Sequence, residues 1–135
     1  MTKKFSLPIV NKGAEPQTAP TASEGPRPRS EGGTVLDEIA HEVNQNKILI
    51  YMKGSPQMPQ CGFSARASQI LTSYGVPYAH VNILMDPEKR QAIKEYSQWP
   101  TIPQIYINGE FLGGSDILFE MYQNGELESL IDELR

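Results

Sequence analysis

The 135-residue chain is poor in cysteine, and Cys61 is the only one. A single cysteine cannot form a disulfide within the chain, which argues against a disulfide-stapled secreted module. It also cannot complete a tetrahedral zinc or iron site from protein ligands alone, because such a site needs about four of them. A metal bound through Cys61 would therefore need ligands from other molecules.

Long apolar runs and an excess of positive charge are also missing. The chain has no run of about 18 apolar residues, which excludes a transmembrane helix. Its formal net charge is −4, whereas nucleic-acid-binding domains usually carry a basic patch. We therefore expect neither a membrane nor a nucleic-acid partner. The length suits one domain with its own hydrophobic core.

Residues 1–33 differ in composition from the rest of the chain, because Phe5 is their only aromatic residue and prolines are frequent. Such a segment cannot bury enough apolar surface to offset the entropy of ordering, so we expect a disordered N-terminal extension followed by one domain over 34–135. Acidic residues are mixed with the basic ones and no helical stripe is present, which does not fit a transit peptide. A remnant of a cleaved presequence and a plain tail both stay open.

The chain is organised around the segment KGSPQMPQCGFS, from Lys53 to Ser64. A strand-forming run, Ile48–Met52, leads into this turn-rich loop, and a helical pattern starts directly after Cys61. The positive end of that helix dipole and the charge of Lys53, if the loop folds back, both favour the thiolate and lower the cysteine pKa. The alternative is a small buried structural cysteine. The loop chemistry favours a functional thiol.

Hydrophobic periodicity and turn signals predict the element order α-β-α-β-α-β-β-α-α. Thr34 and Asp86 are the expected N-caps of the first and third helices, with Pro87 at the first helical position. Asn108-Gly109 predicts a two-residue hairpin turn. His80 lies in an alternating strand pattern, which favours an ordinary surface or edge residue over a ligand or base. The expected helices end near 46, 74, 97, 124 and 134, and the expected strands are 47–52, 77–83, 104–107 and 110–112.

This order predicts an α/β thioredoxin-like fold. A βαβ unit gives parallel neighbours, and the hairpin adds antiparallel strands, so the sheet should be four-stranded and mixed, with helices on both faces. The end of the first strand, the proline before the hairpin and the turn at Gly113-Gly114 would converge at one edge, beside Cys61. Uncovered N–H groups after such a double glycine can bind an anion, although a simple turn is the commoner role.

Four motifs follow one another along the chain: Lys53-Gly54, Cys61-Gly-Phe-Ser64, Trp99-Pro-Thr-Ile-Pro103-Gln104 and Gly113-Gly114-Ser115-Asp116. In this order and spacing they resemble the motifs of monothiol glutaredoxins of the Cys-Gly-Phe-Ser type. The resemblance covers roughly residues 34–135, and the single-domain form is similar to the mitochondrial iron–sulfur branch. It implies a mitochondrial matrix location, with plastid or bacterial cytoplasm as alternatives.

The resemblance implies a groove for glutathione or an analogous low-molecular-weight thiol. Lys53 would meet the glycine carboxylate, helped by Arg90 and Lys94 from the third helix. Ile102, before a proline expected in cis, would offer backbone hydrogen bonds to the cysteinyl part of glutathione. The residues that complete this end of the groove are Phe63, Thr101 and Pro103.

The other end of the implied groove would hold the γ-glutamyl group. Gly114, Ser115 and Asp116 would bind it, with the helix N-terminus attracting its carboxylate and Asp116 its amine. The chain departs from many relatives here, because they carry a second cysteine where it has Ser115. An internal disulfide with Cys61 is therefore impossible.

The function that the resemblance implies follows from the number of thiols. Ser64 stands where dithiol glutaredoxins have their second cysteine, and a hydroxyl cannot form a disulfide. Cys61 and glutathione would each give one thiolate, so that two protomers bridge a 2Fe-2S cluster, and the apo protein would be a monomer. Apo iron–sulfur acceptor proteins would receive the cluster. The alternatives are glutathione-dependent thiol-disulfide exchange through Cys61, as a weak oxidoreductase at most, and an adaptor that binds a BolA-like protein.

Overall fold

The computed structural model describes residues 32–134. The predicted disorder of the N-terminal extension therefore lies outside the described residues, apart from positions 32 and 33. None of the described helices is long and apolar enough to cross a bilayer. The helices are α1 (Val35–Gln45), α2 (Gly62–Ser73), α3 (Pro87–Ser97), α4 (Ser115–Asn124), α5 (Glu126–Leu134) and the 3₁₀ turn η3 (Ile83–Met85).

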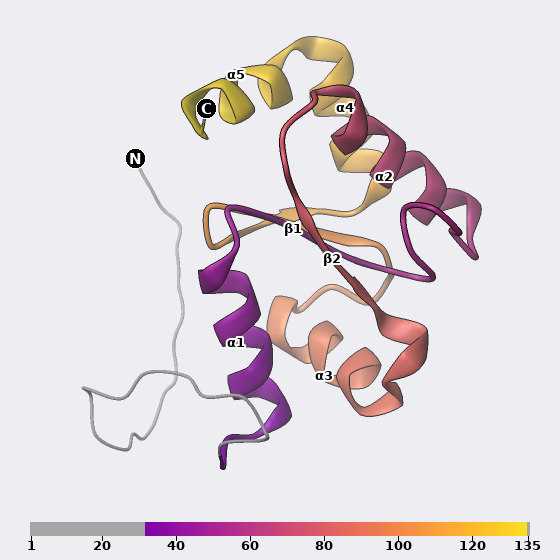
Figure 1. Ribbon diagram of the computed structural model, residues 1–135, viewed down its shortest axis with the longest axis vertical. Helices are drawn as coiled ribbons and strands as arrows, with labels where there is room; N and C mark the ends of the chain where they lie inside the picture. Colours follow the sequence, from indigo (N-terminus) through magenta and orange to yellow (C-terminus); the bar gives the residue numbers. More distant parts are fainter. Residues whose placement is uncertain (1–31, 135) are drawn as a thin grey trace.

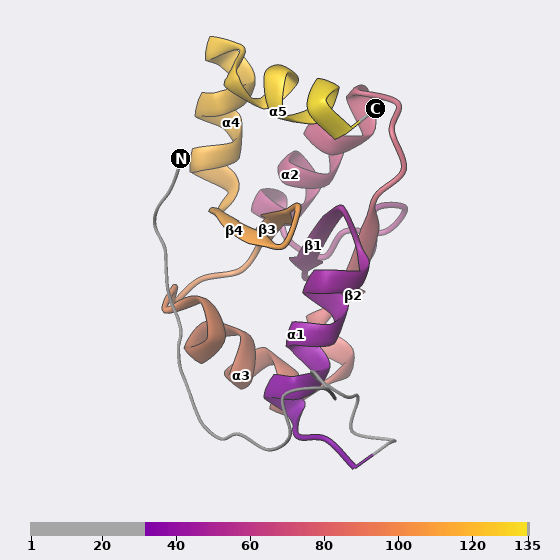
Figure 2. The same ribbon diagram turned by 90° about the vertical axis from the view of Figure 1, so that its left-hand side faces the viewer.

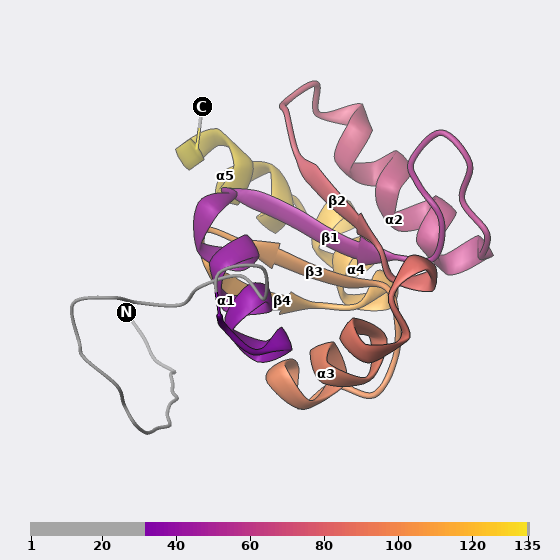
Figure 3. The same ribbon diagram turned by 60° about the horizontal axis from the view of Figure 1, so that its bottom comes forward.

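Four strands form one mixed sheet in the order β2-β1-β3-β4 (Figures 1 and 3). Strands β1 and β2 are parallel, whereas β1 pairs antiparallel with β3 and β3 with β4. The sequence-based expectation of a thioredoxin-like α/β fold is confirmed. The strands are β1 (Ile48–Met52), β2 (Ala79–Asn82), β3 (Gln104–Ile107) and β4 (Glu110–Gly113).

Helices cover both faces of the sheet, as expected. Helices α2, α4 and α5 lie on one side, and α1 and α3 lie on the other (Figure 2). Strand β1 is buried along its whole length. Its residues alternate between the two layers, with Ile50 packing in the α2 side and Leu49 in the α1 side. This is why β1 reads as an unbroken apolar run.

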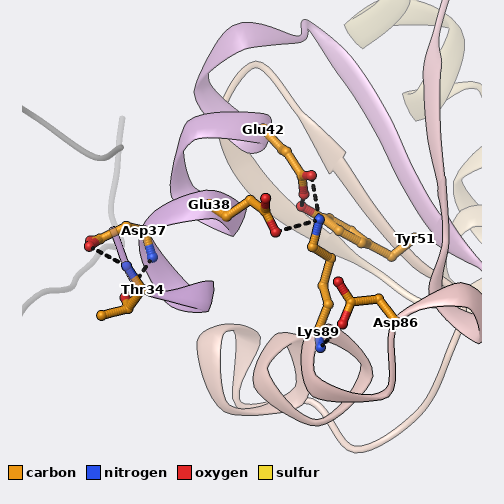
Figure 4. Close-up of polar contacts among 7 residues, drawn as sticks. All are labelled: Thr34, Asp37, Glu38, Glu42, Tyr51, Asp86 and Lys89. Atoms are coloured by element: carbon orange, nitrogen blue, oxygen red, sulfur yellow. Dashed lines mark hydrogen bonds and ion pairs between the residues drawn. The ribbon is translucent and has the colours of Figure 1, made fainter. Parts of the chain in front are cut away.

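The local signals for helix starts and for the hairpin are borne out. Thr34 and Asp37 form a capping box at the start of α1 (Figure 4), and the Asp86 side chain accepts the Lys89 N–H at 3.0 Å at the start of α3. In the hairpin, Asn108 has φ 54° and Gly109 has φ 84°, which are the two positive values that a type I′ turn requires.

Strand β2 is shorter than the predicted strand 77–83. It begins at Ala79 and ends at Asn82. The Asn82 side-chain oxygen accepts the N–H of Leu84 at 3.0 Å and that of Gly54 at 3.0 Å. The first bond caps η3, so the chain turns where β1 ends opposite Asn82. His80 is exposed on this edge strand, as the alternating pattern indicated.

A buried ion-pair network joins α1 to α3 (Figure 4). The Lys89 ammonium lies 2.6 Å from a Glu42 carboxylate oxygen and 3.0 Å from one of Glu38, and only 8% of its side chain is exposed. Tyr51 donates to the other Glu42 oxygen at 2.7 Å. Burial alone would lower the pKa of Lys89, but the hydrogen bonds and charges of Glu42 and Glu38 outweigh it, so this pKa is raised.

We predict that Lys89→Met destabilises the protein by about 3 kcal/mol at neutral pH, because it leaves two largely buried carboxylates without their cation. The raised pKa means that the lysine contributes fully below its unfolded-state pKa of about 10.4, and that the contribution fades as the pH rises above that value. Urea unfolding at pH 7 and pH 11 measures both effects. Lys47→Met, at an exposed lysine, is the control; equal losses in the two variants would contradict the prediction.

Candidate functional site

The loop after β1 folds back on itself, which brings Cys61 beside Lys53. The Gln60 N–H donates to the Lys53 carbonyl at 2.9 Å, and Gly54 forms a bridge with Pro59. Gly54 has φ +93°, and a Cβ built on it would lie 2.4 Å from the Met58 carbonyl oxygen. Only glycine fits there. The sequence predicted that Lys53 would lower the pKa of Cys61 if the loop folds back, and the loop does fold back.

Cys61 is the N-cap residue of α2 and is half-buried. The backbone N–H of Ser64 holds the pKa of the Cys61 thiol below its ordinary value. Burial opposes this shift, and the Phe63 N–H, the Lys53 charge and the Ser64 hydroxyl add to it. The pKa of Cys61 is thus shifted in the predicted direction, and the first turn of α2 contributes more to the shift than the Lys53 charge does.

Ser64 has a role at this site that sequence reasoning missed. Its side chain is fully buried, and its Oγ accepts the Lys53 N–H at 3.0 Å. A hydroxyl that accepts this bond still has its own proton to donate, and the Ser64 hydroxyl is one of the groups that lower the pKa of Cys61. The residue does more than replace a second cysteine, because it ties the chain that leaves β1 to the first turn of α2. No spacing pattern in the sequence signals this contact.

A pocket of about 350 Å³ opens beside Cys61. It is lined by all ten residues that the sequence predicted for ligand binding, whereas Cys61 itself is outside the lining. The pocket adjoins Cys61 through Lys53 and Phe63. Trp99, Pro100 and Ile117 complete the wall and were not predicted as site residues. The predicted residues that line it are Lys53, Phe63, Arg90, Lys94, Thr101, Ile102, Pro103, Gly114, Ser115 and Asp116.

The charges in the pocket are separated. Arg90 and Lys94, one helical turn apart on α3, face it together with Lys53. The opposite wall is the N-terminus of α4, where Gly114 is the N-cap and supplies no side-chain cap. Ser115 Oγ is buried there without a hydrogen-bond partner among residues 32–134. The pocket thus offers cations on one side, and N–H groups with the Asp116 carboxylate on the other.

The Phe63 ring and the segment around the Ile102–Pro103 peptide bond complete the pocket. The Phe63 ring is 58% exposed and contributes apolar surface at its edge. The peptide bond between Ile102 and Pro103 is cis, as expected. Among residues 32–134, neither the N–H nor the C=O of Ile102 takes part in a hydrogen bond. Both groups can therefore bond a ligand in the pocket.

Comparison with known proteins identifies the family. Residues 48–112 match the family model Glutaredoxin. The chain is 57% identical over 90 residues to an uncharacterized monothiol glutaredoxin, ycf64-like, of Synechocystis sp., which covers 67% of this chain and 84% of the relative. The chain belongs to the monothiol glutaredoxin family. Glutaredoxin 4 of Escherichia coli is 49% identical to this glutaredoxin over 100 residues, or 74% of the chain and 87% of the relative.

Solved structures agree with this assignment. Reduced apo GrxS14 of poplar is 47% identical, with a TM-score of 0.63 over 70% of this chain and 87% of its own. A monomeric truncated mutant of 1-C-Grx1 from Trypanosoma brucei is 34% identical, with a TM-score of 0.68 over 76% and 93%. The thioredoxin-like fold of this monothiol glutaredoxin is thereby confirmed, and glutathione is the thiol partner of its family.

We predict that Cys61 of the apo protein reacts with iodoacetamide at a pH below that of an ordinary cysteine, because hydrogen bonds stabilise its thiolate. Ser64→Ala removes a hydroxyl that lowers this pKa and should move the midpoint of the rate-against-pH curve upward. Ser68→Ala is the matched control, since it removes a buried hydroxyl on the same helix that donates to the Ala65 carbonyl at 3.1 Å. Identical midpoints in the two variants would exclude the Ser64 hydroxyl as a thiolate donor.

Proposed function

We propose that the pocket binds glutathione with its thiol next to Cys61. The observation that carries this proposal is the gathering of ten predicted residues around one pocket beside the cysteine. Glutathione is a zwitterionic tripeptide: its glycine carboxylate fits Lys53, Arg90 and Lys94, and its γ-glutamyl carboxylate fits the N-terminus of α4. Asp116 would pair with the γ-glutamyl amine, and the backbone of Ile102 would bond the cysteinyl residue between these ends.

We further propose that this glutaredoxin carries a 2Fe-2S cluster as cargo between iron–sulfur proteins. Residues 32–134 contain no group of three or more histidine, cysteine or acidic side chains that could hold a metal. Cys61 supplies one thiolate, so the remaining sulfur ligands must come from glutathione and from a second protomer. The fit rests on the lowered pKa of Cys61 and on the adjoining pocket. Ligands supplied partly by a small molecule also favour release to an acceptor.

Anaerobic reconstitution with iron, sulfide and glutathione tests the cluster proposal. We expect a coloured dimer on a sizing column, and a colourless monomer once glutathione is removed, because four thiolates are needed. Cys61→Ser should remove the visible absorption bands. S-methylglutathione is the control, since it can fill the pocket but has no free thiolate. A coloured protein with S-methylglutathione alone would contradict ligation by the glutathione sulfur.

For the pocket itself, Arg90→Ala should weaken glutathione binding by about 1.5–3 kcal/mol, the usual contribution of one charge-assisted hydrogen bond. Calorimetric titration measures the affinity. Lys47→Ala removes one positive charge at an exposed position outside the pocket lining and should leave it unchanged. An affinity of Arg90→Ala equal to that of wild type would assign Arg90 to the solvent-exposed surface only.

Thiol exchange is the second candidate function, and the lowered pKa of Cys61 favours it. The Cys61 thiolate would attack a glutathionylated protein and release its thiol, and a second glutathione would then reduce the Cys61 mixed disulfide and leave as glutathione disulfide. Negligible turnover of a glutathione mixed disulfide by the apo protein would exclude it.

The partner and the compartment are also part of the proposal. We propose that the same pocket region binds a BolA-like protein. The resemblance implies a mitochondrial location, whereas the relatives described above from Synechocystis and Escherichia are bacterial and favour the bacterial alternative.

A further inference from the structure

Gln104 is a fully buried polar residue directly behind the pocket wall. Its side chain is 0% exposed, and it begins β3 immediately after the pocket-lining segment 99–103. Its Nε2 donates to the Trp99 carbonyl at 3.0 Å and to the Thr101 carbonyl at 3.2 Å. Its Oε1 accepts the Tyr106 hydroxyl at 3.2 Å. Both amide hydrogens and the amide oxygen are thus used inside the protein.

The neighbours of Gln104 determine the orientation of its amide. Two backbone carbonyls can only accept, so the nitrogen must face them. The Tyr106 hydroxyl is kept protonated, because burial raises its pKa, and it can donate to the oxygen. Rotating the amide by half a turn would set its oxygen against two carbonyl oxygens and lose both bonds to them.

The segment that Gln104 holds has few hydrogen bonds of its own. Pro100 and Pro103 have no N–H to donate. At the start of the segment, the Trp99 N–H donates to the Lys94 carbonyl and to the Ser97 hydroxyl oxygen. The bonds from Gln104 to Trp99 and Thr101 continue this anchoring toward Ile102, whose N–H and C=O form no hydrogen bond within residues 32–134.

We propose that Gln104 is a positioning residue of the glutathione pocket: its buried amide holds the Trp99 and Thr101 carbonyls and so presents the Ile102 backbone to the ligand. Gln104 does not touch the ligand. The inference rests on the proposed glutathione site for its effect on affinity, whereas its effect on the segment 99–103 is independent of any ligand.

Gln104→Met tests this role, because methionine has a similar size and no donor. We expect glutathione affinity to fall by roughly tenfold in calorimetric titration at a temperature where the variant is folded. Ser68→Ala is the matched control: it removes a buried hydroxyl that donates to the Ala65 carbonyl on α2, outside the pocket lining. Its affinity should stay within about twofold of wild type. Equal affinities of Gln104→Met and wild type would overturn the proposal, and so would an equal loss in Ser68→Ala.

Amide hydrogen exchange separates this proposal from the proposed function. In the absence of ligand, Gln104→Met should speed exchange of the Trp99 N–H, which donates to the Lys94 carbonyl and to Ser97 Oγ, by about tenfold relative to the effect of Ser68→Ala. That result would support the positioning role even if wild-type protein failed to bind glutathione, whereas unchanged exchange at Trp99 would overturn it. If Gln104→Met does not fold, Tyr106→Phe decides by the same measurement, since it removes only the hydroxyl that orients the amide.

Discussion

Strand β1 has no face toward water, and this constraint organises the molecule. Its five buried residues need a layer of helices on each side. One layer brings α3, with Arg90 and Lys94, below the end of the strand, and the other brings the N-termini of α2 and α4 above it. Because β1 ends between these layers, the chain that leaves it at Lys53 enters the space where cations and helix N-termini meet. The site is a consequence of where the central strand stops.

The chemistry of Cys61 depends on backbone groups more than on charged side chains. The largest cause of its lowered pKa is the Ser64 N–H, and the Lys53 charge contributes less. A fold that fixes the start of α2 therefore also fixes the reactivity of the thiol. The bond from the Lys53 N–H to Ser64 Oγ makes the same connection from the strand side. Lys53 belongs to the loop and Ser64 to the first turn of α2, so a change in the loop conformation would also change the groups that set the pKa of Cys61.

Sequence reasoning succeeded where the signal is local. Helix caps, the Asn108-Gly109 turn and the apolar run of β1 each depend on neighbours within a few residues. It missed contacts that distant residues make. Asn82, where β2 ends, also accepts a bond from the Gly54 N–H, 28 positions away, and the buried Lys89 ammonium donates to Glu42, 47 positions away. The pocket residues were found through family resemblance, whereas Gln104, which no ligand would touch, left no functional signal of its own.

The distribution of charge has a kinetic consequence. The pocket carries three cations, although the whole chain has a net charge of −4. Helix α4, with ten residues and a length of about 15 Å, leads from the pocket to α5, whose Glu126, Glu128, Asp132 and Glu133 are all acidic. Opposite charges at the two ends of α4 create a local electric field in which the cationic side of the pocket attracts an approaching anion. Encounter with glutathione should therefore be oriented before contact, and dissolved salt would slow arrival more than departure.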